Sequence, residues 1–175
     1  MGLQGKKVAL LIDEMFNEFE LIYPYYRLLE AGVEVVVVGP PGGGTFKGKS
    51  GLTFAADAGI DRVDPGSFDG VVIPGGYAPD HMRRHQATLD LVARLDKAGK
   101  LVAAICHAGW VLASAGILEG RTLTSYFAIK DDLVHAGAVW QDQPVVVDAN
   151  LVTARKPDDL PAFLKAILEG LSAQA

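Results

Sequence analysis

The sequence predicts an α/β fold with a doubly wound, mainly parallel sheet that is sandwiched between helices. Short, almost continuous apolar runs alternate along the chain with segments whose apolar residues recur every three or four positions. Runs of the first kind are typical of parallel strands buried on both faces, and segments of the second kind are typical of the helices that connect them. The 175 residues, 50% of them hydrophobic, suffice for a single domain spanning residues 1–175.

A β-α-β unit is expected at the start of the chain. Residues 7–12 form the first apolar run, and residues 33–38 form the second. Gly32 stands between them, where a helix would end. Apolar residues at helical spacing indicate that helix, namely Phe19, Ile22, Tyr26 and Leu29.

The rest of the chain continues the alternation of strands and helices. After a loop rich in Pro and Gly at residues 39–44, the stretch 52–56 is expected to pair as short strands, and residues 70–74 form the third buried strand. A helix through Leu89, Val92 and Leu95 leads to the strand 101–105. The remaining expected elements are a helix at 107–113, a strand at 121–124, a helix near 129–135, a hairpin over 139–153 and a closing helix through Phe163, Ile167 and Leu171.

Composition excludes several classes of function. The formal net charge is −5 and the basic residues are scattered, so no surface for nucleic acid or an anionic membrane is indicated. One cysteine excludes an internal disulfide framework, and no apolar stretch has the length of a signal peptide or a membrane span. We therefore expect a cytoplasmic protein without a cofactor that acts on small or peptide-like partners.

Cys106, the only cysteine, lies where the run 101–105 gives way to the next expected helix. Unpaired N–H groups at a helix start favour a thiolate, and the small residues Ala104 and Ala108 permit the sharp turn that exposes a nucleophile in hydrolases. The alternative is that Cys106 is a small buried hydrophobic residue. Its position at the junction favours the nucleophile.

Three segments follow the carboxyl ends of expected parallel strands, where sites form in such sheets. They are an acidic stretch from Asp13 to Glu20, the turn Pro74-Gly75-Gly76, and Cys106 with His107. The N–H groups of Gly76 and His107 would serve as an oxyanion hole, with Gly75 offering a further unobstructed N–H. An ordinary tight turn is the alternative for the two glycines.

A cysteine nucleophile needs a partner that takes its proton. His107 is one candidate if a carboxylate orients it, although it could equally be a helix N-terminal residue without a role. Glu20 or Glu18 could instead share a proton with Cys106 if burial raises the pKa of the acid. The alternative for both acids is a solvated first turn of a helix.

Two motif matches are rejected on their context. Residues 43–50 satisfy the phosphate-loop pattern, but the chain that follows is expected to be extended, whereas a phosphate loop leads into a helix. His81 and His85 have the spacing of a helical metal pair, but two arginines lie between them and no further ligands are evident. No metal site is expected.

Taken together, several motifs spread over nearly the whole chain resemble the ThiJ/PfpI superfamily, and most closely its PfpI-type branch of intracellular cysteine peptidase-like (peptidase C56-like) proteins. The motifs that carry the resemblance are Glu20-Leu-Ile-Tyr-Pro24, Gly48-Lys49-x-Gly51, Val72-Ile-Pro-Gly-Gly76, Ala104-Ile-Cys-His107, Thr124-Ser-Tyr126, Lys130-Asp-Asp132, Val145-Val-Val-Asp148 and Arg155-Lys-Pro157. The resemblance implies a flavodoxin-like sandwich of the class I glutamine amidotransferase-like type.

The resemblance also implies roles for individual residues. Cys106 is the nucleophile and Glu20 its acidic partner, and Tyr126 and Lys49 line the site. His107 is expected to pair with an acid of a neighbouring subunit at Asp80, where the peptidases have Glu. A second departure from the family pattern is at positions 107–109, where this chain has His-Ala-Gly and the family usually has His-Gly-Pro. A homodimer or homohexamer is expected, with the site completed across the interface.

The function expected from this resemblance is a cysteine-dependent hydrolase or lyase in stress protection. Its substrates would be peptides, reactive carbonyls (glyoxalase) or glycated groups (deglycase). The alternative is a non-catalytic redox sensor or holdase chaperone in which Cys106 is oxidised to a sulfinate. A flavin-binding module is a weaker alternative that rests on the fold class alone.

Overall fold

The computed structural model describes residues 3–174 and contains a central seven-stranded sheet. The strand order is β10-β11-β7-β6-β1-β2-β5, and every pair is parallel except β10 with β11. The bounds are β1 (Lys7–Leu11), β2 (Glu34–Gly39), β5 (Ala58–Gly59), β6 (Gly70–Ile73), β7 (Leu101–Ile105), β10 (Val145–Asp148) and β11 (Leu151–Ala154). The predicted mainly parallel sheet is confirmed.

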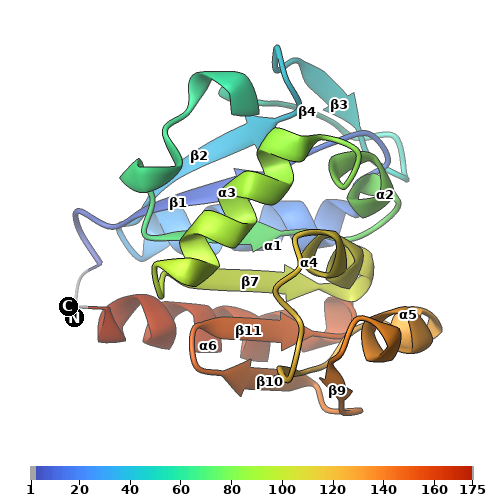
Figure 1. Cartoon of the computed structure of the whole chain (residues 1–175). Helices are drawn as coiled ribbons and strands as arrows, with labels where there is room; N and C mark the ends of the chain where they lie inside the picture. The colour runs from blue at the N-terminus through green and yellow to red at the C-terminus, as the bar shows by residue number, and fades with distance from the viewer. Residues whose placement is uncertain (1–2, 175) are drawn as a thin grey trace.

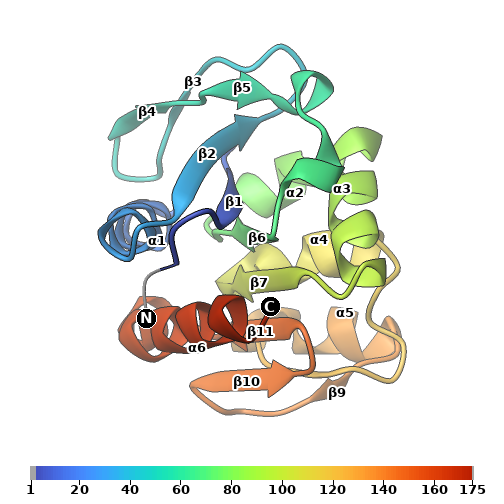
Figure 2. The same cartoon turned by 90° about the vertical axis from the view of Figure 1, so that its left-hand side faces the viewer.

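Helices cover both faces of this sheet, as Figures 1 and 2 show. On one face α1 (Glu18–Glu30) packs beside α6 (Leu160–Ala173). The other face carries α2 (Ala78–Met82), α3 (Gln86–Lys97), α4 (Gly109–Ser114) and α5 (Lys130–His135). Strands β1, β6 and β7 are therefore covered on both sides, and each of their residues except Lys7 is buried.

The spacing of apolar residues predicted helix α1 correctly, but most of the residues that indicated it lie on the solvent-exposed face of the helix. Phe19 and Tyr26 are 71% and 62% exposed, and Leu29 is also exposed. The buried positions are Glu20, Leu21, Pro24 and Leu28. Both stripes share the helical period, so periodicity locates the helix without showing which stripe meets the sheet. One consequence is that Glu20 is directed into the protein.

Two short sheets lie outside the central one. Strands β3 (Thr45–Lys47) and β4 (Thr53–Ala55) form an antiparallel hairpin, so the phosphate-loop pattern falls on extended chain. Strands β8 (Thr122–Leu123) and β9 (Val139–Trp140) pair in parallel. The hairpin predicted over 139–153 is wrong in its first half, because residues 139–140 satisfy their hydrogen bonds with β8 and only β10 and β11 form the hairpin.

The segment between β6 and α3 contains α2, which periodicity did not indicate because it is only five residues long. The chain leaves helical geometry after Arg83, and His85 takes extended angles as the residue before α3. His81 therefore lies in α2 and His85 precedes α3, so the two histidines do not share a helix. Across residues 3–174, His, Cys, Asp and Glu side chains form no cluster of three or more that could hold a metal ion. Within the same residues, no helix is both long and apolar enough to cross a bilayer.

Candidate active site

Cys106 occupies a strained turn between β7 and α4. Its φ is +63°, in the left-handed region that residues other than glycine rarely adopt. The turn is a single 3-10 segment, Cys106–Ala108, and the flanking residues Ala104 and Ala108 are both buried. The predicted sharp turn with small neighbours is therefore present, and it presents the sulfur at the carboxyl end of β7.

Glu20 reaches the sulfur from the first turn of α1. Asn17 caps that turn by accepting hydrogen bonds from the N–H groups of Phe19 and Glu20 at 3.1 and 3.4 Å. The Glu20 side chain is completely buried, and its Oε2 accepts the Gly75 N–H at 2.7 Å. Its carboxyl also lies against the Cys106 thiol, and Oε1 has no hydrogen-bond partner among the described atoms. Glu18 is directed elsewhere, since its Oε1 accepts the N–H of Ser50.

Burial sets the protonation of this pair. It raises the pKa of Glu20 to about 7, against the lowering effect of the Gly75 N–H. Burial also raises the pKa of the Cys106 thiol, and the negative charge of Glu20 raises it further. The N–H groups of His107 and Gly76 lower the thiol pKa by a smaller amount. The expectation of a thiolate favoured by the helix start alone was therefore wrong, because burial outweighs the field of the backbone.

The two acids titrate as a coupled pair. The first proton leaves near neutral pH, and the second leaves far above it because burial disfavours the thiolate and because two negative charges would then lie side by side. Between these two pKa values the pair holds one proton, which Glu20 can accept from the sulfur during attack and later return.

His107 faces the sulfur on its other side. Nδ1 lies 3.3 Å from Sγ of Cys106. The ring stacks on Tyr126 with centroids 5.0 Å apart and meets Trp110 edge-on at 5.2 Å. Burial lowers the pKa of His107, and the charge of Lys49 lowers it further, so the imidazole is neutral at neutral pH. A neutral ring can exchange a proton with the sulfur or with a bound molecule.

The turn after β6 is clamped by the loop after β1. Gly76 has φ +80°, and a Cβ atom there would lie 2.5 Å from the Met15 carbonyl oxygen. The Asn17 N–H donates to the Gly75 carbonyl at 3.2 Å, and the Tyr77 N–H donates to the Met15 carbonyl at 2.9 Å. This close fit holds the Gly76 N–H toward Cys106, where it and the His107 N–H converge.

A cleft of about 380 Å³ opens over these groups. It is lined by Asn17, Glu20, Lys49, Gly76, Tyr77, Cys106, His107, Tyr126, Lys156 and Pro157. All the predicted site residues except Gly75 and Asp80 are thus brought together. Gly75 lies beneath the cleft, and its N–H is engaged by Glu20 rather than free to bind an oxyanion.

A profile of the DJ-1/PfpI family matches residues 6–170. The chain belongs to this family. Deglycase PfpI of Pyrococcus furiosus is 41% identical over 163 residues, which cover 93% of this chain and 98% of that protein. Protein/nucleic acid deglycase 2 of Escherichia coli is 41% identical over 171 residues, covering 97% and 99%.

Solved structures show the same fold as this DJ-1/PfpI protein. DJ-1beta of Drosophila melanogaster superposes with a TM-score of 0.90 at 34% identity and covers 98% of this chain and 91% of its own. A two-domain protein from Anabaena variabilis, with DJ-1/ThiJ/PfpI-like and ferritin-like domains, gives a TM-score of 0.93 at 45% identity. The match covers 95% of this chain and 50% of that one, so this chain spans half the length of the two-domain protein.

Asp80 lies apart from the cleft in this DJ-1/PfpI protein. It is half-buried on α2, and its carboxylate pairs with Arg84 one turn further along. Its pairing with His107 of a neighbouring subunit stays a prediction.

Sequence reasoning assigned no role to four residues that line the cleft: Asn17, Tyr77, Lys156 and Pro157. Lys156 and Pro157 belong to one of the motifs that carried the resemblance, but that motif pointed to no role. Only the approach of the segment after β11 to Cys106 places them at the site.

Proposed function

We propose that this DJ-1/PfpI protein is a Cys106-dependent enzyme that removes reactive carbonyl compounds, a glyoxalase or deglycase in stress protection. One observation carries the proposal: the sulfur of a strained turn lies beside the buried carboxyl of Glu20 at a small cleft. Relatives that cover almost the whole chain are named deglycases, which supports the same class of reaction.

The first step is addition of Cys106 to a carbonyl carbon. The S–C bond forms as the π bond of the carbonyl opens, and the proton of the thiol passes to Glu20. The negative charge moves to the former carbonyl oxygen, which is within the field of the Gly76 and His107 N–H groups. Protonation of that oxygen gives a hemithioacetal.

The second step applies to 2-oxoaldehydes. The neutral His107, at 3.3 Å from the sulfur, takes the proton from the hemithioacetal carbon, and a proton returns to the neighbouring carbon. The result is a thioester of a 2-hydroxy acid. Water then breaks the C–S bond, which releases the acid and restores the thiol. The balance is one 2-oxoaldehyde and one water to one 2-hydroxy acid, without an external oxidant.

Removal of free carbonyl also explains a deglycase activity. Early adducts of aldehydes with amines and thiols dissociate reversibly, so consumption of the aldehyde drives them back to the unmodified groups. A cleft of about 380 Å³ suits such small molecules better than an extended peptide, which needs a longer groove.

The test is conversion of methylglyoxal to lactate by the wild type, Cys106→Ser and Glu20→Gln. We expect Cys106→Ser to lose turnover and Glu20→Gln to lose about two orders of magnitude, as for removal of a positioned acid-base group. Lys165→Gln, on the exposed side of α6, is the control. Full activity of Cys106→Ser would refute the proposal, and cleavage of peptides without carbonyl consumption would replace it by a peptidase.

A redox sensor is the second candidate, and one observation favours it. Oε1 of Glu20 is buried without a partner among the described residues, beside the sulfur. If peroxide oxidises Cys106 to the sulfinic acid, a protonated Glu20 would hydrogen-bond an added oxygen. Intact mass after peroxide treatment would show the gain of two oxygen atoms, and this gain without any carbonyl turnover would favour the sensor.

We also propose that a second copy completes the site through Asp80. Among the described residues no side chain hydrogen-bonds Nε2 of His107, so this atom is open to a partner. Sedimentation velocity should give a dimer or hexamer, and Asp80→Ala should lower turnover in the assembled protein. A monomer with full activity would exclude a shared site.

A further inference from the structure

We propose that the cleft over Cys106 selects carbonyl substrates that carry an anionic group, a carboxylate or a phosphate, which Lys156 and Lys49 bind. This inference rests on the proposed function, because it names the class of substrate for the same nucleophile. No sequence pattern assigned a role to Lys156, which reaches the site only through the fold.

Two distant segments supply the cations. Lys49 follows β3, and Lys156 lies between β11 and the turn Pro157–Asp159, yet both line the cleft that holds the sulfur. Nζ of Lys49 lies 5.6 Å from the centroid of the Tyr77 ring at the same cleft. The charge of Lys49 acts on both Glu20 and His107, which places it within electrostatic reach of the reacting atoms.

The charges that line the cleft do not balance within it. Against two lysines stands only Glu20, which is completely buried and accepts the Gly75 N–H below the cleft. His107 contributes no negative charge. A cationic cleft stands out in a chain whose formal net charge is −5, since random placement would favour an acidic surface.

Lys156 has one counter-charge, which lies outside the cleft lining. Its Nζ is 3.0 Å from Oδ2 of Asp158, and the two side chains are 48% and 77% exposed. Exposed pairs of this kind contribute little and exchange readily with water. Lys156 can therefore turn to an anionic group in the cleft at small cost.

The probe of this inference is a pair of reagents that differ only in charge. Iodoacetate and iodoacetamide both alkylate the sulfur, with formation of an S–C bond and loss of iodide, and neither requires turnover. The measured quantity is the ratio of the two rates at Cys106, normalised to the same ratio for N-acetylcysteine. This normalisation removes the intrinsic difference between the reagents.

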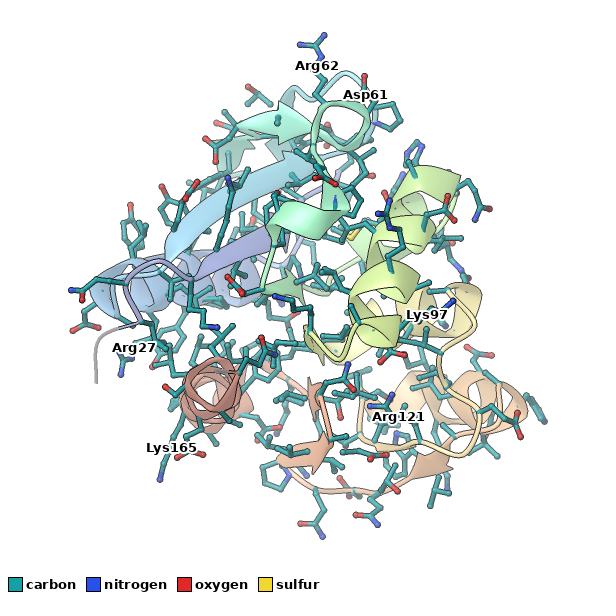
Figure 3. The ribbon with its side chains drawn as sticks, turned by 60° about the vertical axis from the view of Figure 1, so that its left-hand side comes forward. Arg27, Asp61, Arg62, Lys97, Arg121 and Lys165 are labelled. Carbon is teal, nitrogen blue, oxygen red and sulfur yellow. The ribbon has the colours of Figure 1, made fainter. Side chains whose placement is uncertain are left out.

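We expect the normalised ratio to exceed one and to fall about two- to fivefold in Lys156→Gln and in Lys49→Gln, and further in the double variant. Arginine at either position should keep the ratio, and added salt should reduce it. Lys165→Gln removes the same charge from the solvent-facing side of α6, where Figure 3 shows the side chain extending away from the body, and should leave the ratio unchanged. A ratio near one that the lysine variants do not alter would overturn the inference.

Two further arms separate the outcomes. Acetate and inorganic phosphate, as competitors of iodoacetate, report which anion the lysines prefer. Turnover of a 2-oxoaldehyde with a terminal carboxylate is compared with that of its methyl ester. Charge selectivity in alkylation without any turnover would support the anion site and refute the proposed enzyme. Equal turnover of acid and ester, with no selectivity in alkylation, would refute the anion site and leave the enzyme.

Discussion

Replacement of Glu20 by Gln is expected to stabilise the folded protein, and the gain should grow as the pH rises. The substitution keeps the shape of the side chain, and the amide oxygen can still accept the Gly75 N–H that now lies 2.7 Å from Oε2. It removes only the ionisation of a completely buried group. Since an ionised carboxylate in this position lacks water, its absence benefits the folded state.

The magnitude follows from the pKa of Glu20. Burial raises it from 4.5 to about 7, a difference of about 2.5 units. Each unit corresponds to about 1.4 kcal/mol, which gives about 3 kcal/mol in total. Because the folded pKa lies above the unfolded value, the folded state holds the proton more tightly. The wild type therefore loses this stability as the pH rises from about 4.5 to about 7, and the variant does not.

Urea unfolding at pH 5 and pH 8 measures the difference. The gap in free energy of unfolding between Glu20→Gln and the wild type should widen by about 2–3 kcal/mol between these two pH values. Glu30→Gln removes an exposed carboxylate from the last turn of the same helix and should leave the pH dependence of the wild type unchanged. A constant gap between pH 5 and pH 8 would show that Glu20 is not the desolvated acid described above.

The remaining predictions concern the reactivity of the sulfur and the packing around it. In the wild type the rate of Cys106 alkylation by iodoacetamide should rise with pH with a midpoint near pH 7, where Glu20 ionises and can accept the proton of the thiol. In Glu20→Gln the midpoint should move above about 9, because only the thiol remains to titrate and burial raises its pKa. An unchanged midpoint would contradict proton transfer between Cys106 and Glu20. Gly75→Ala should abolish this rise and cost about 1–3 kcal/mol of stability, since its Cβ would lie 2.5 Å from Oε2 of Glu20 and 2.7 Å from Cβ of Cys106; unaltered alkylation would show that the site can relax. Arg121→Ala should lower the free energy of unfolding in urea by about 3 kcal/mol, because its largely buried guanidinium pairs with two aspartates, at 3.0 and 3.4 Å. Arg27, a surface residue labelled in Figure 3, is the control, and Arg27→Ala should lower it by less than about 1 kcal/mol. Equal losses would show that burial of the Arg121 ion pairs does not matter.

Local pattern determined the elements of this protein and the position of its candidate nucleophile. The apolar runs at residues 7–12, 70–74 and 101–105 correspond to buried strands. In a parallel strand covered on both faces, side chains on either face are buried, so nearly every residue is apolar. The same reasoning located Cys106 at the junction of strand and helix. These three strands are neighbours in the sheet, so the segments that follow them meet at one edge, as the sequence predicted.

The tertiary structure alone decided which groups lie beside Cys106. The residues on the buried face and on the exposed face of α1 recur with the same helical period. Only packing against the sheet placed Glu20 inward and Phe19 outward. The sequence does not distinguish Glu18 from Glu20. In the structure Glu18 accepts the N–H of Ser50, whereas Glu20 lies beside the sulfur of Cys106. Burial decides that the pKa of the Cys106 thiol is raised, and the fold brings Lys156 to the same cleft as Lys49 and Cys106, which lie far from it in the sequence. Burial and proximity between distant segments are properties of the packed chain, which periodicity and spacing do not encode.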